Sequence, residues 1–447
     1  MASTQENPLP QDAAEAPKGY WDDRQAAKEN LRMFEAPGIW RRFADQMDED
    51  QETVTEPGCA QKLESSLINC LNSTNVLLLT GAGSSFSARN DEASKLKERT
   101  APSLTALWKA VKTKVGDAAF ADVISKIPNG AAINDIEKLL TQCKLFVALY
   151  GNASGDGKTV SNFISSAEDA ILDRVDFVDE ATGLSAHEAI LRKLARRGSR
   201  KPRAKVFTTN YDLCYEYSAR RLRFVIVDGF SHAAPPVYDR SHFSLDIVRL
   251  DGSDNAPDYF ENVFQLYKLH GSLDWRRTAG DVIRSRTNDG TPVLIYPRDS
   301  KYQEAFEPPF LDMMGTFQTA LRKPDTTLFV AGFSFSDSHL AQPLIAALES
   351  NMNFRLVVCD PAFLTDDDVE NDPVIVKDAA PPANSFHQRL ERLAKTGDHR
   401  LILLHGRFED FAKALPDLVA ETERESHAAR VKALREAGPP DAKVGSP

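Results

Sequence analysis

The sequence predicts an α/β fold with a mainly parallel sheet and a helical insertion. Eight short apolar segments predict the strands, at 75–80, 204–208, 223–227, 265–269, 292–296, 326–331, 354–359 and 400–404. Several are continuous β-branched or leucine-rich runs, which are typical of parallel strands buried on both faces. Helical patterns separate many of these segments, as strand–helix–strand units require.

The stretch at about 100–200 differs from the rest because it has helical periodicity and few strand signals. Its apolar side chains recur at the spacing of one helix face, as in Ile136, Leu139, Leu140, Cys143 and Val147. We therefore expect a helical insertion between the first and second strands.

The two ends of the chain are more polar than its centre. Residues 1–57 are acidic and contain several prolines, yet they also carry large aromatic side chains at Trp21, Phe34, Trp40 and Phe43. We expect a partly mobile N-terminal extension with short helices that dock on the main domain or on another subunit. The main domain would span 58–419, and 420–447 would form a helix and a disordered tail.

Composition narrows the class of protein. The 447 residues carry a net charge of −11, which argues against broad attraction to nucleic acid or anionic membranes. The polar start and the lack of an apolar run near ~20 residues predict a cytoplasmic protein without a membrane partner. The five cysteines are scattered, with no C-x-x-C pair, so no structural zinc site is expected. The basic run 192–205 is either a solvated helix end or a contact for nucleic acid or an acidic partner.

A glycine turn follows the first predicted strand. The sequence Gly81-Ala82-Gly83-Ser84 would let the backbone approach a pyrophosphate, as in Rossmann-like dinucleotide sites. The alternative is a tight strand–helix turn with no ligand. The full G-x-G-x-x-G pattern is incomplete, because Ala88 stands in the region where the helix would start.

Polar side chains also follow the second and fourth predicted strands. Asn210 and Asp212 lie where open α/β sheets bind ligands, although either residue could instead cap the following helix. His270 precedes a glycine at a strand end and is suited to general-base chemistry, whereas a structural histidine is the alternative. Among the other histidines, His339 is the nearest rival.

Two later strand ends carry small hydroxyls and acids. Ser334 lies in the segment that begins at Gly332 and ends at Asp337, and it could bind ribose or phosphate. The alternative there is a helix cap by Ser336 or Asp337. Asp360 could hold adenosine ribose hydroxyls, or it could form a turn before Pro361.

Taken in order, these strand-end motifs resemble the sirtuin superfamily, and most closely its bacterial branch found in antiphage defence. The resemblance covers about 60–410. It implies that the Gly81–Ser84 turn (Gly81, Ala82, Gly83, Ser84) cradles the pyrophosphate and that Asn210 and His270 are catalytic. It also implies the remaining cofactor contacts: Asp212 near the carboxamide, Gly332 and Ser334 on the adenine side, and Asp360 on the adenosine.

Two departures from protein-deacylating sirtuins bear on the expected activity. The four-cysteine zinc module is missing from the sequence, and SSFSARNDEASK replaces the usual Gly-Ile-Pro-Asp-Phe-Arg-like segment after the glycine turn. The resemblance thus implies an NAD glycohydrolase, with NAD as substrate and no zinc. An NAD-dependent deacylase and a non-catalytic sensor of NAD or ADP-ribose stay open as alternatives.

Control of such an activity is not visible in the sequence. The resemblance implies a homo-oligomer or pairing with a separately encoded HerA-like ATPase, with nucleic acid acting only indirectly or through that partner.

Overall fold

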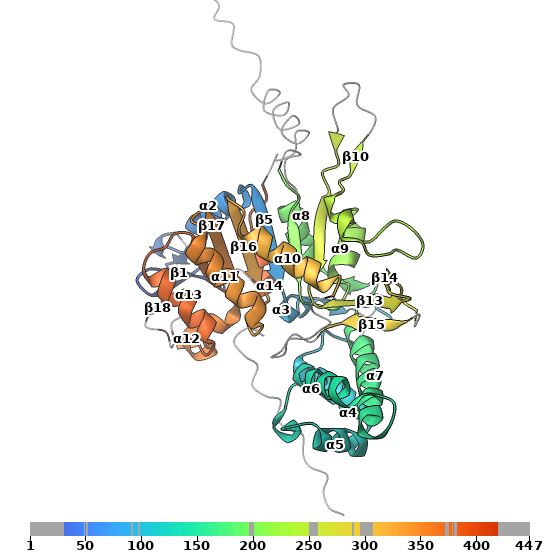
Figure 1. The fold of residues 1–447 in the computed structure, drawn as a ribbon. Helices are drawn as coiled ribbons and strands as arrows, with labels where there is room; N and C mark the ends of the chain where they lie inside the picture. The colour runs from blue at the N-terminus through green and yellow to red at the C-terminus, as the bar shows by residue number, and fades with distance from the viewer. Residues whose placement is uncertain are drawn as a thin grey trace, which may run out of the picture.

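The computed structural model describes residues 31–418 apart from 49, 51, 91–92, 97–98, 196–200, 250–257, 288–289, 296–306, 372–374, 378 and 380–381. Within this part of the chain a ten-stranded sheet runs in the order β18-β2-β1-β19-β17-β16-β5-β8-β12-β9 (Figure 1). Its parallel strands are β5 (Asn75–Thr80), β8 (Lys205–Thr208), β9 (Val225–Val227), β12 (Val263–Lys268), β16 (Thr326–Ala331), β17 (Phe354–Cys359) and β19 (Leu401–His405). The predicted α/β fold with a mainly parallel sheet is confirmed.

The parallel strands form because their apolar runs are buried on both faces. In β16 all six residues are buried, and β5 and β17 have five buried residues each. Side chains of alternate residues point to opposite faces, so Leu77 and Leu79 lie in one core whereas Val76 and Leu78 lie in the other. Such strands are stable only when helices cover both faces.

Two sets of helices supply that cover. One face packs against α10 (Phe310–Leu321), α11 (Ser338–Ser350) and α13 (Ser385–Lys395). The other face packs against α2 (Ala60–Leu71), α8 (Ser185–Ala195), α9 (Cys214–Leu222) and α14 (Phe408–Ala414). The result is a three-layer arrangement of helices, sheet and helices.

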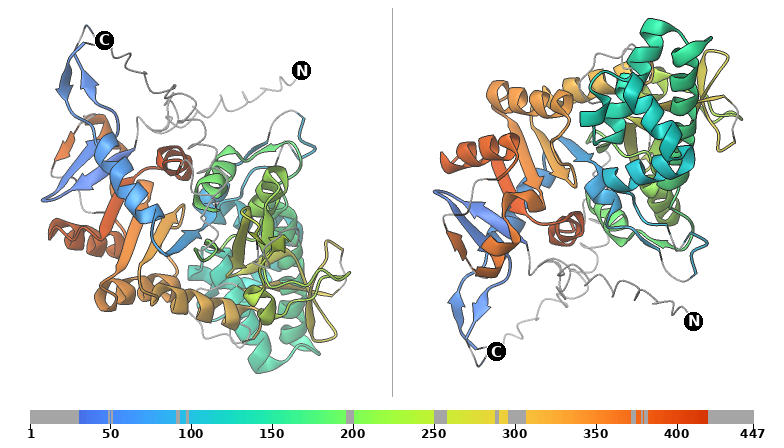
Figure 2. Two further views of the ribbon diagram at one scale, coloured as in Figure 1. Left: turned by 90° about the horizontal axis from the view of Figure 1, so that it is seen from above. Right: turned by 90° about the horizontal axis from the view of Figure 1, so that it is seen from below.

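A separate helical bundle lies beyond the sheet, between β5 and β8 in the sequence (Figures 1 and 2). It consists of α4 (Leu104–Val115), α5 (Asp117–Lys126), α6 (Ile136–Tyr150) and α7 (Gly155–Val175). The bundle has its own core, which includes the predicted helix face at Ile136, Leu139, Leu140 and Cys143. It joins the main body through Tyr211, Leu213, Leu273 and Leu294, and it thereby stands over the loop after β8.

A small antiparallel sheet leaves the main sheet after β12. It has the order β14-β13-β15, with β13 (Gly271–Thr278), β14 (Asp281–Arg284) and β15 (Thr291–Leu294). The predicted strand 292–296 was therefore placed in the wrong sheet. The chain turns away at Gly271, where φ is +96° and a Cβ would lie 2.1 Å from the Val293 carbonyl oxygen.

The expectation of short helices in the N-terminal extension was wrong for its described part. Strands β1 (Arg32–Glu35) and β2 (Ile39–Arg42) form an antiparallel hairpin, and β1 pairs with β19. Trp40 is 1% exposed and packs against Phe34 and Phe363, because its place in the strand points it into the core. Strand β18 (Ile375–Lys377) then pairs with β2 at the sheet edge. Trp21 and the predicted C-terminal helix and tail lie outside the described residues.

The remaining elements are short. They are β3 (Gln46–Met47), β4 (Val54–Glu56), α3 (Ala82–Ser85), β6 (Arg89–Asn90), β7 (Thr182–Gly183), β10 (Val248–Arg249), β11 (Asp258–Tyr259) and α12 (Asp366–Asn371). In the described ranges, every helix is too short or too polar to cross a membrane.

Candidate functional site

The order of the strands reverses between β5 and β16. From β5 the chain builds β8, then β9 at the edge of the sheet and β12 between β8 and β9. It then returns to the other side of β5 to build β16, β17 and β19. Loops that leave two such strands diverge, and open α/β sheets bind their ligands in the crevice this creates at the carboxyl ends. The predicted motifs after β5, β8, β12 and β16 all lie at this edge.

The two glycine turns at the reversal touch each other. The amides of Gly81 and Gly83 donate to the carbonyl oxygen of Gly332, at 3.1 and 3.0 Å. Gly332 has φ +69°, and a Cβ on it would lie 2.4 Å from the Ser84 nitrogen. The glycines are thus needed for close contact between the turns, and two of the amides expected to face a pyrophosphate are engaged inside the protein.

Asn210 is fixed by the segment that follows β5. Its side-chain nitrogen donates to the Gly81 carbonyl oxygen at 2.9 Å and lies 3.0 and 2.7 Å from the hydroxyl oxygens of Ser84 and Ser85. The backbone N–H of Asn210 donates to Thr208 Oγ1 at 3.2 Å. With the amide nitrogen held this way, the carbonyl oxygen Oδ1 is the end of the side chain suited to accept from a ligand or water.

Asp212 is a buried anchor beside Asn210. One carboxylate oxygen accepts from Ser85 Oγ at 2.5 Å, and the other accepts from the Cys214 backbone N–H at 3.0 Å, at the start of α9. The N-cap residue of α9 is Leu213, which makes no capping side-chain hydrogen bond, so the contact of Asp212 with Cys214 is a turn that leads into the helix and the cap expected as an alternative is not observed. The same carboxylate holds Ser85, which in turn holds the amide of Asn210.

His270 lies between β12 and β13 and is 3% exposed. Its Nε2 is 3.8 Å from a carboxylate oxygen of Asp337, and its ring centroid is 6.2 Å from that of His339. Burial and the nearby His339 lower the pKa of His270 well below its ordinary value, and burial also lowers the pKa of His339. His270 is consequently neutral at neutral pH, with a lone pair that can take up a proton.

These residues line one cleft with about 800 Å³ of space, including the part that opens to solvent. The sheet edge contributes Gly81, Ala82, Asn210, Asp212 and His270, and the turn after β16 contributes Ser334, Ser336 and Asp337. The helical bundle covers the other side with Leu104, Leu107 and Glu137.

Gly83, Ser84, Gly332 and Asp360 do not line the cleft. The first three support the contact between the turns. Asp360 is buried after β17, where it accepts from the Ala362 backbone N–H at 2.8 Å and lies 3.3 Å from Nε2 of His387. The turn expected as the alternative for Asp360 is thus observed, and its adenosine contact stays a prediction.

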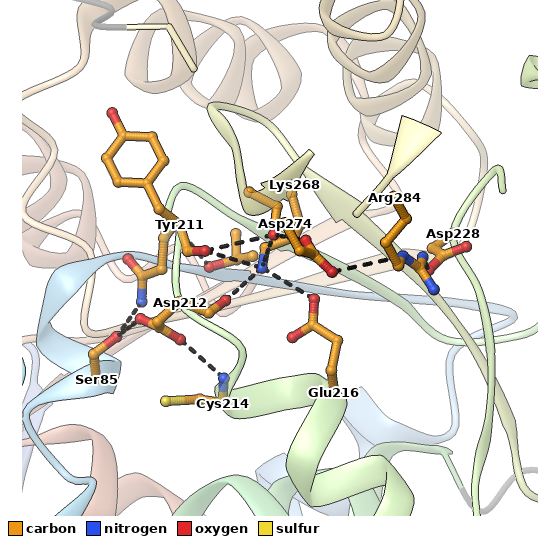
Figure 3. A network of polar contacts seen from close by, with 12 residues as sticks. Ser85, Tyr211, Asp212, Cys214, Glu216, Asp228, Lys268, Asp274 and Arg284 are labelled. Carbon is orange, nitrogen blue, oxygen red and sulfur yellow. Dashed lines mark hydrogen bonds and ion pairs between the residues drawn. The ribbon is translucent and has the colours of Figure 1, made fainter. Parts of the chain in front are cut away.

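A chain of polar contacts extends from Asp212 through Lys268 (Figure 3). Lys268, 2% exposed at the end of β12, donates to the Asp212 carbonyl oxygen, to Glu216 Oε1 at 3.0 Å and to Ser272 Oγ at 2.9 Å. Burial raises the pKa of Glu216, and the attraction of Lys268 opposes that shift.

The same chain of contacts continues into the small sheet. Ser272 donates to Asp274 at 2.6 Å, and Arg284 lies between Asp274 and Asp228. This chain of contacts connects the loop after β8 with β13 and β14. Sequence reasoning missed Lys268, although a lysine inside an apolar strand segment is itself a signal.

Part of the basic run is accounted for within the protein. Lys193 donates to the carbonyl oxygens of Ala412 and Leu415 at the end of α14, and Arg203 pairs with Asp246 at 2.9 Å. Residues 196–200 lie outside the described part, so contact of this run with nucleic acid stays a prediction. Across the residues that the structure describes, His, Cys, Asp and Glu side chains form no group that could hold a metal.

The strand order and the cleft at its reversal define a Rossmann-like α/β protein with a candidate ligand site where such sheets bind nucleotides. Residues 204–378 match the family model described as SIR2-like domain, which supports the sirtuin-like superfamily for this part of the chain. SIR2-like domains use NAD, and the family includes NAD-dependent enzymes. The matched range contains Asn210, His270 and Asp337 but begins after the Gly81 turn. A search of curated proteins gives no match.

Proposed function

We propose that this protein hydrolyses NAD to nicotinamide and ADP-ribose. The observation that carries the proposal is that Asn210 and His270 line one cleft at the reversal of strand order in a chain with a SIR2-like domain. The nicotinamide of NAD is already cationic and departs as a neutral molecule, so the leaving group needs no general acid. One hydrogen-bond acceptor and one base are sufficient.

The two side chains have distinct roles in this reaction. Oδ1 of Asn210 accepts from the attacking water or a ribose hydroxyl, because the amide nitrogen is held by the turn after β5. Neutral His270 takes up a proton from that water or hydroxyl. General-base catalysis of this kind contributes about 10²–10⁴-fold to the rate.

Hydrolysis is preferred over deacylation because of the segment after the glycine turn. Where deacylases carry a Gly-Ile-Pro-Asp-Phe-Arg-like segment, this chain begins with two serines whose hydroxyls bind the Asn210 amide. The segment thus supports the water-positioning residue. The sequence also lacks the cysteine pairs of the zinc module found in deacylases.

The resemblance to the antiphage branch supports a biological role. We propose that the protein depletes cellular NAD during phage infection, when self-assembly or a HerA-like ATPase activates it. The protein would then be cytoplasmic, since that is where the NAD pool of the cell lies.

The test is to incubate the full chain with NAD and to measure nicotinamide and ADP-ribose by chromatography. The chain is assayed alone, at high concentration, with DNA and with a HerA-like ATPase. Asn210→Ala and His270→Ala should each lose most turnover while their melting curves stay close to that of the wild type. Asn162→Ala and His399→Ala are matched controls, since both residues are exposed and lie outside the cleft.

The other outcomes separate the alternatives. NAD loss only in the presence of an acylated peptide would identify a deacylase. NAD binding without turnover under every condition would identify a sensor. Wild-type rates in either cleft variant would refute the assignment of that residue.

A further inference from the structure

The turn after β16 brings a carboxylate to the buried histidine of the cleft. Asp337 Oδ2 lies 3.8 Å from Nε2 of His270, and the two side chains are 13% and 4% exposed. Nε2 is buried and has no hydrogen-bond partner among the described residues. We propose that Asp337 is a positioning residue that orients the His270 ring and stabilises the imidazolium formed when His270 takes up a proton. This inference rests on the proposed function.

The conformation of the turn supports this role. Asp337 stands at the N-cap of α11, yet no side-chain hydrogen bond from it caps the helix. Asp residues at this position usually accept from the first free amides of the helix. Here the backbone carbonyl of Asp337 accepts from Leu340 and Ala341, whereas the carboxylate lies on the side of His270.

Phe335 fixes the turn two residues earlier. It has φ +56°, an uncommon and strained value for a large side chain, and it is only 4% exposed. Its ring stacks on Phe386 at 4.5 Å and meets Phe333 edge-on at 5.3 Å. Strain held by surrounding aromatic packing is typical of turns that place a functional group, and the group placed here is Asp337.

The surroundings of His270 disfavour a positive charge on its ring, and the Asp337 carboxylate counteracts this effect. Burial and His339 both disfavour a positive charge on His270, so the isolated ring would be a weak base. His339 approaches from α11, whereas the acids Asp212 and Glu137 line the same cleft from the loop after β8 and from α6. Asp337 approaches the imidazole from the turn after β16, at 3.8 Å.

In the proposed reaction the proton moves from water to Nδ1 of His270. The Nε2–H of His270 is directed to the Asp337 carboxylate, so the lone pair on Nδ1 accepts a proton from water. The C1′–nitrogen bond breaks first, and its electron pair leaves with neutral nicotinamide, so that C1′ becomes part of an oxocarbenium ion. The water oxygen then bonds to C1′ as its O–H bond breaks and the proton passes to His270. Asp337 stays ionised throughout, and the imidazolium returns its proton to solvent.

The kinetic test compares Asp337→Asn, Asp337→Glu and the exposed control Asp367→Asn in the full chain. In Asp337→Asn the kcat for NAD should fall about 10–100-fold, with KM nearly unchanged, because the effect acts on proton transfer. The acid limb of the kcat/KM profile should move to lower pH, since loss of the carboxylate lowers the pKa of His270 further. Asp337→Glu should restore part of the rate, and Asp367→Asn should match the wild type.

A second readout does not depend on activity. Histidine labelled with ¹³C at the ring reports protonation by NMR, and the signal of His270 is assigned with His270→Gln. The pKa of His270 should be lower in Asp337→Asn than in the wild type. An unchanged pKa, or a loss of NAD binding and melting temperature without a change in the pH profile, would overturn the pairing. If the wild type fails to hydrolyse NAD, the proposed function fails, and the NMR titration still decides on the pair.

Discussion

Replacing Lys268 with methionine should destabilise the fold by about 3–5 kcal/mol, the usual cost of removing one partner of a buried ion pair. Lys268 is 2% exposed, and its ammonium donates hydrogen bonds to Glu216, to Ser272 and to the carbonyl oxygen of Asp212. Without it, Glu216 loses its contact at 3.0 Å, and its second oxygen is already buried without a partner among the described residues. About a fifth of the Glu216 side chain stays accessible, which limits its share of the cost.

A second substitution, at Glu216, separates the cost of the lone carboxylate from the cost of the other contacts that Lys268 makes. In Lys268→Met/Glu216→Leu the lone carboxylate is gone. The main remaining cost, about 1–3 kcal/mol, is the Asp212 carbonyl oxygen without its donor, because the Ser272 hydroxyl still donates to Asp274. The double variant should therefore be more stable than Lys268→Met. Because burial raises the pKa of Glu216, the single variant should lose less stability at mildly acidic pH than at pH 8.

Urea unfolding followed by fluorescence and circular dichroism measures these differences. Lys112→Met is the matched control, because Lys112 is half exposed and makes a surface pair with the exposed Asp117 at 3.3 Å. Such pairs contribute roughly 0.2–0.5 kcal/mol. A loss below about 1 kcal/mol in Lys268→Met, or a double variant no more stable than the single one, would refute the reasoning on buried pairs.

Three further outcomes are expected. His187 is fully buried, and burial lowers its pKa to about 4, so as pH falls the histidine is protonated in the unfolded chain before it is protonated in the folded one. The free energy of unfolding should therefore fall by about 3 kcal/mol between pH 6.5 and pH 4. In His187→Leu, urea unfolding at a series of pH values should no longer show this decrease. Gly332→Ala should lower the free energy of unfolding by about 1–3 kcal/mol more than Gly397→Ala in melting experiments. Both glycines have positive φ, but a Cβ at Gly332 would lie 2.4 Å from the Ser84 nitrogen, whereas a Cβ at Gly397 would meet no atom within 4 Å. Trp40→Ala should cost about 3–5 kcal/mol in urea unfolding if the N-terminal hairpin is part of the core, and a loss under 1 kcal/mol would argue against that.

The parts of the fold that sequence could predict are those where local pattern and environment agree. The bounds of β5, β16 and β17 follow from continuous apolar runs, because both faces of these strands are covered. The hairpin of β1 and β2 carries charged residues between its apolar ones, as in Arg-Met-Phe-Glu and Ile-Trp-Arg-Arg. Its strand structure depends on backbone partners far away in the sequence, which no local pattern reveals.

The same division holds in the cleft. Asn210 and His270 could be placed because each follows a predicted strand, and strand ends meet at one edge of a parallel sheet. The contact of Asp337 with His270 depends on a strained turn fixed by Phe335, and the role of Lys268 depends on which loop lies above it. Such features require the packed structure. Asp360 shows the converse, since a correct strand end did not bring its side chain into the cleft.

The pairing of β1 with β19 also bears on how the chain folds during synthesis. Arg32 lies opposite His405, so the first described strand leaves the ribosome long before the strand that receives it. Until β19 is made, the hairpin has unpaired backbone groups on the side of β1, and Trp40 lacks part of the apolar core that finally surrounds it. Contacts so distant in the sequence form late and expose the nascent chain to aggregation. A chain that stops before residue 401 would keep that exposure permanently, which would mark incomplete copies for chaperones and proteases.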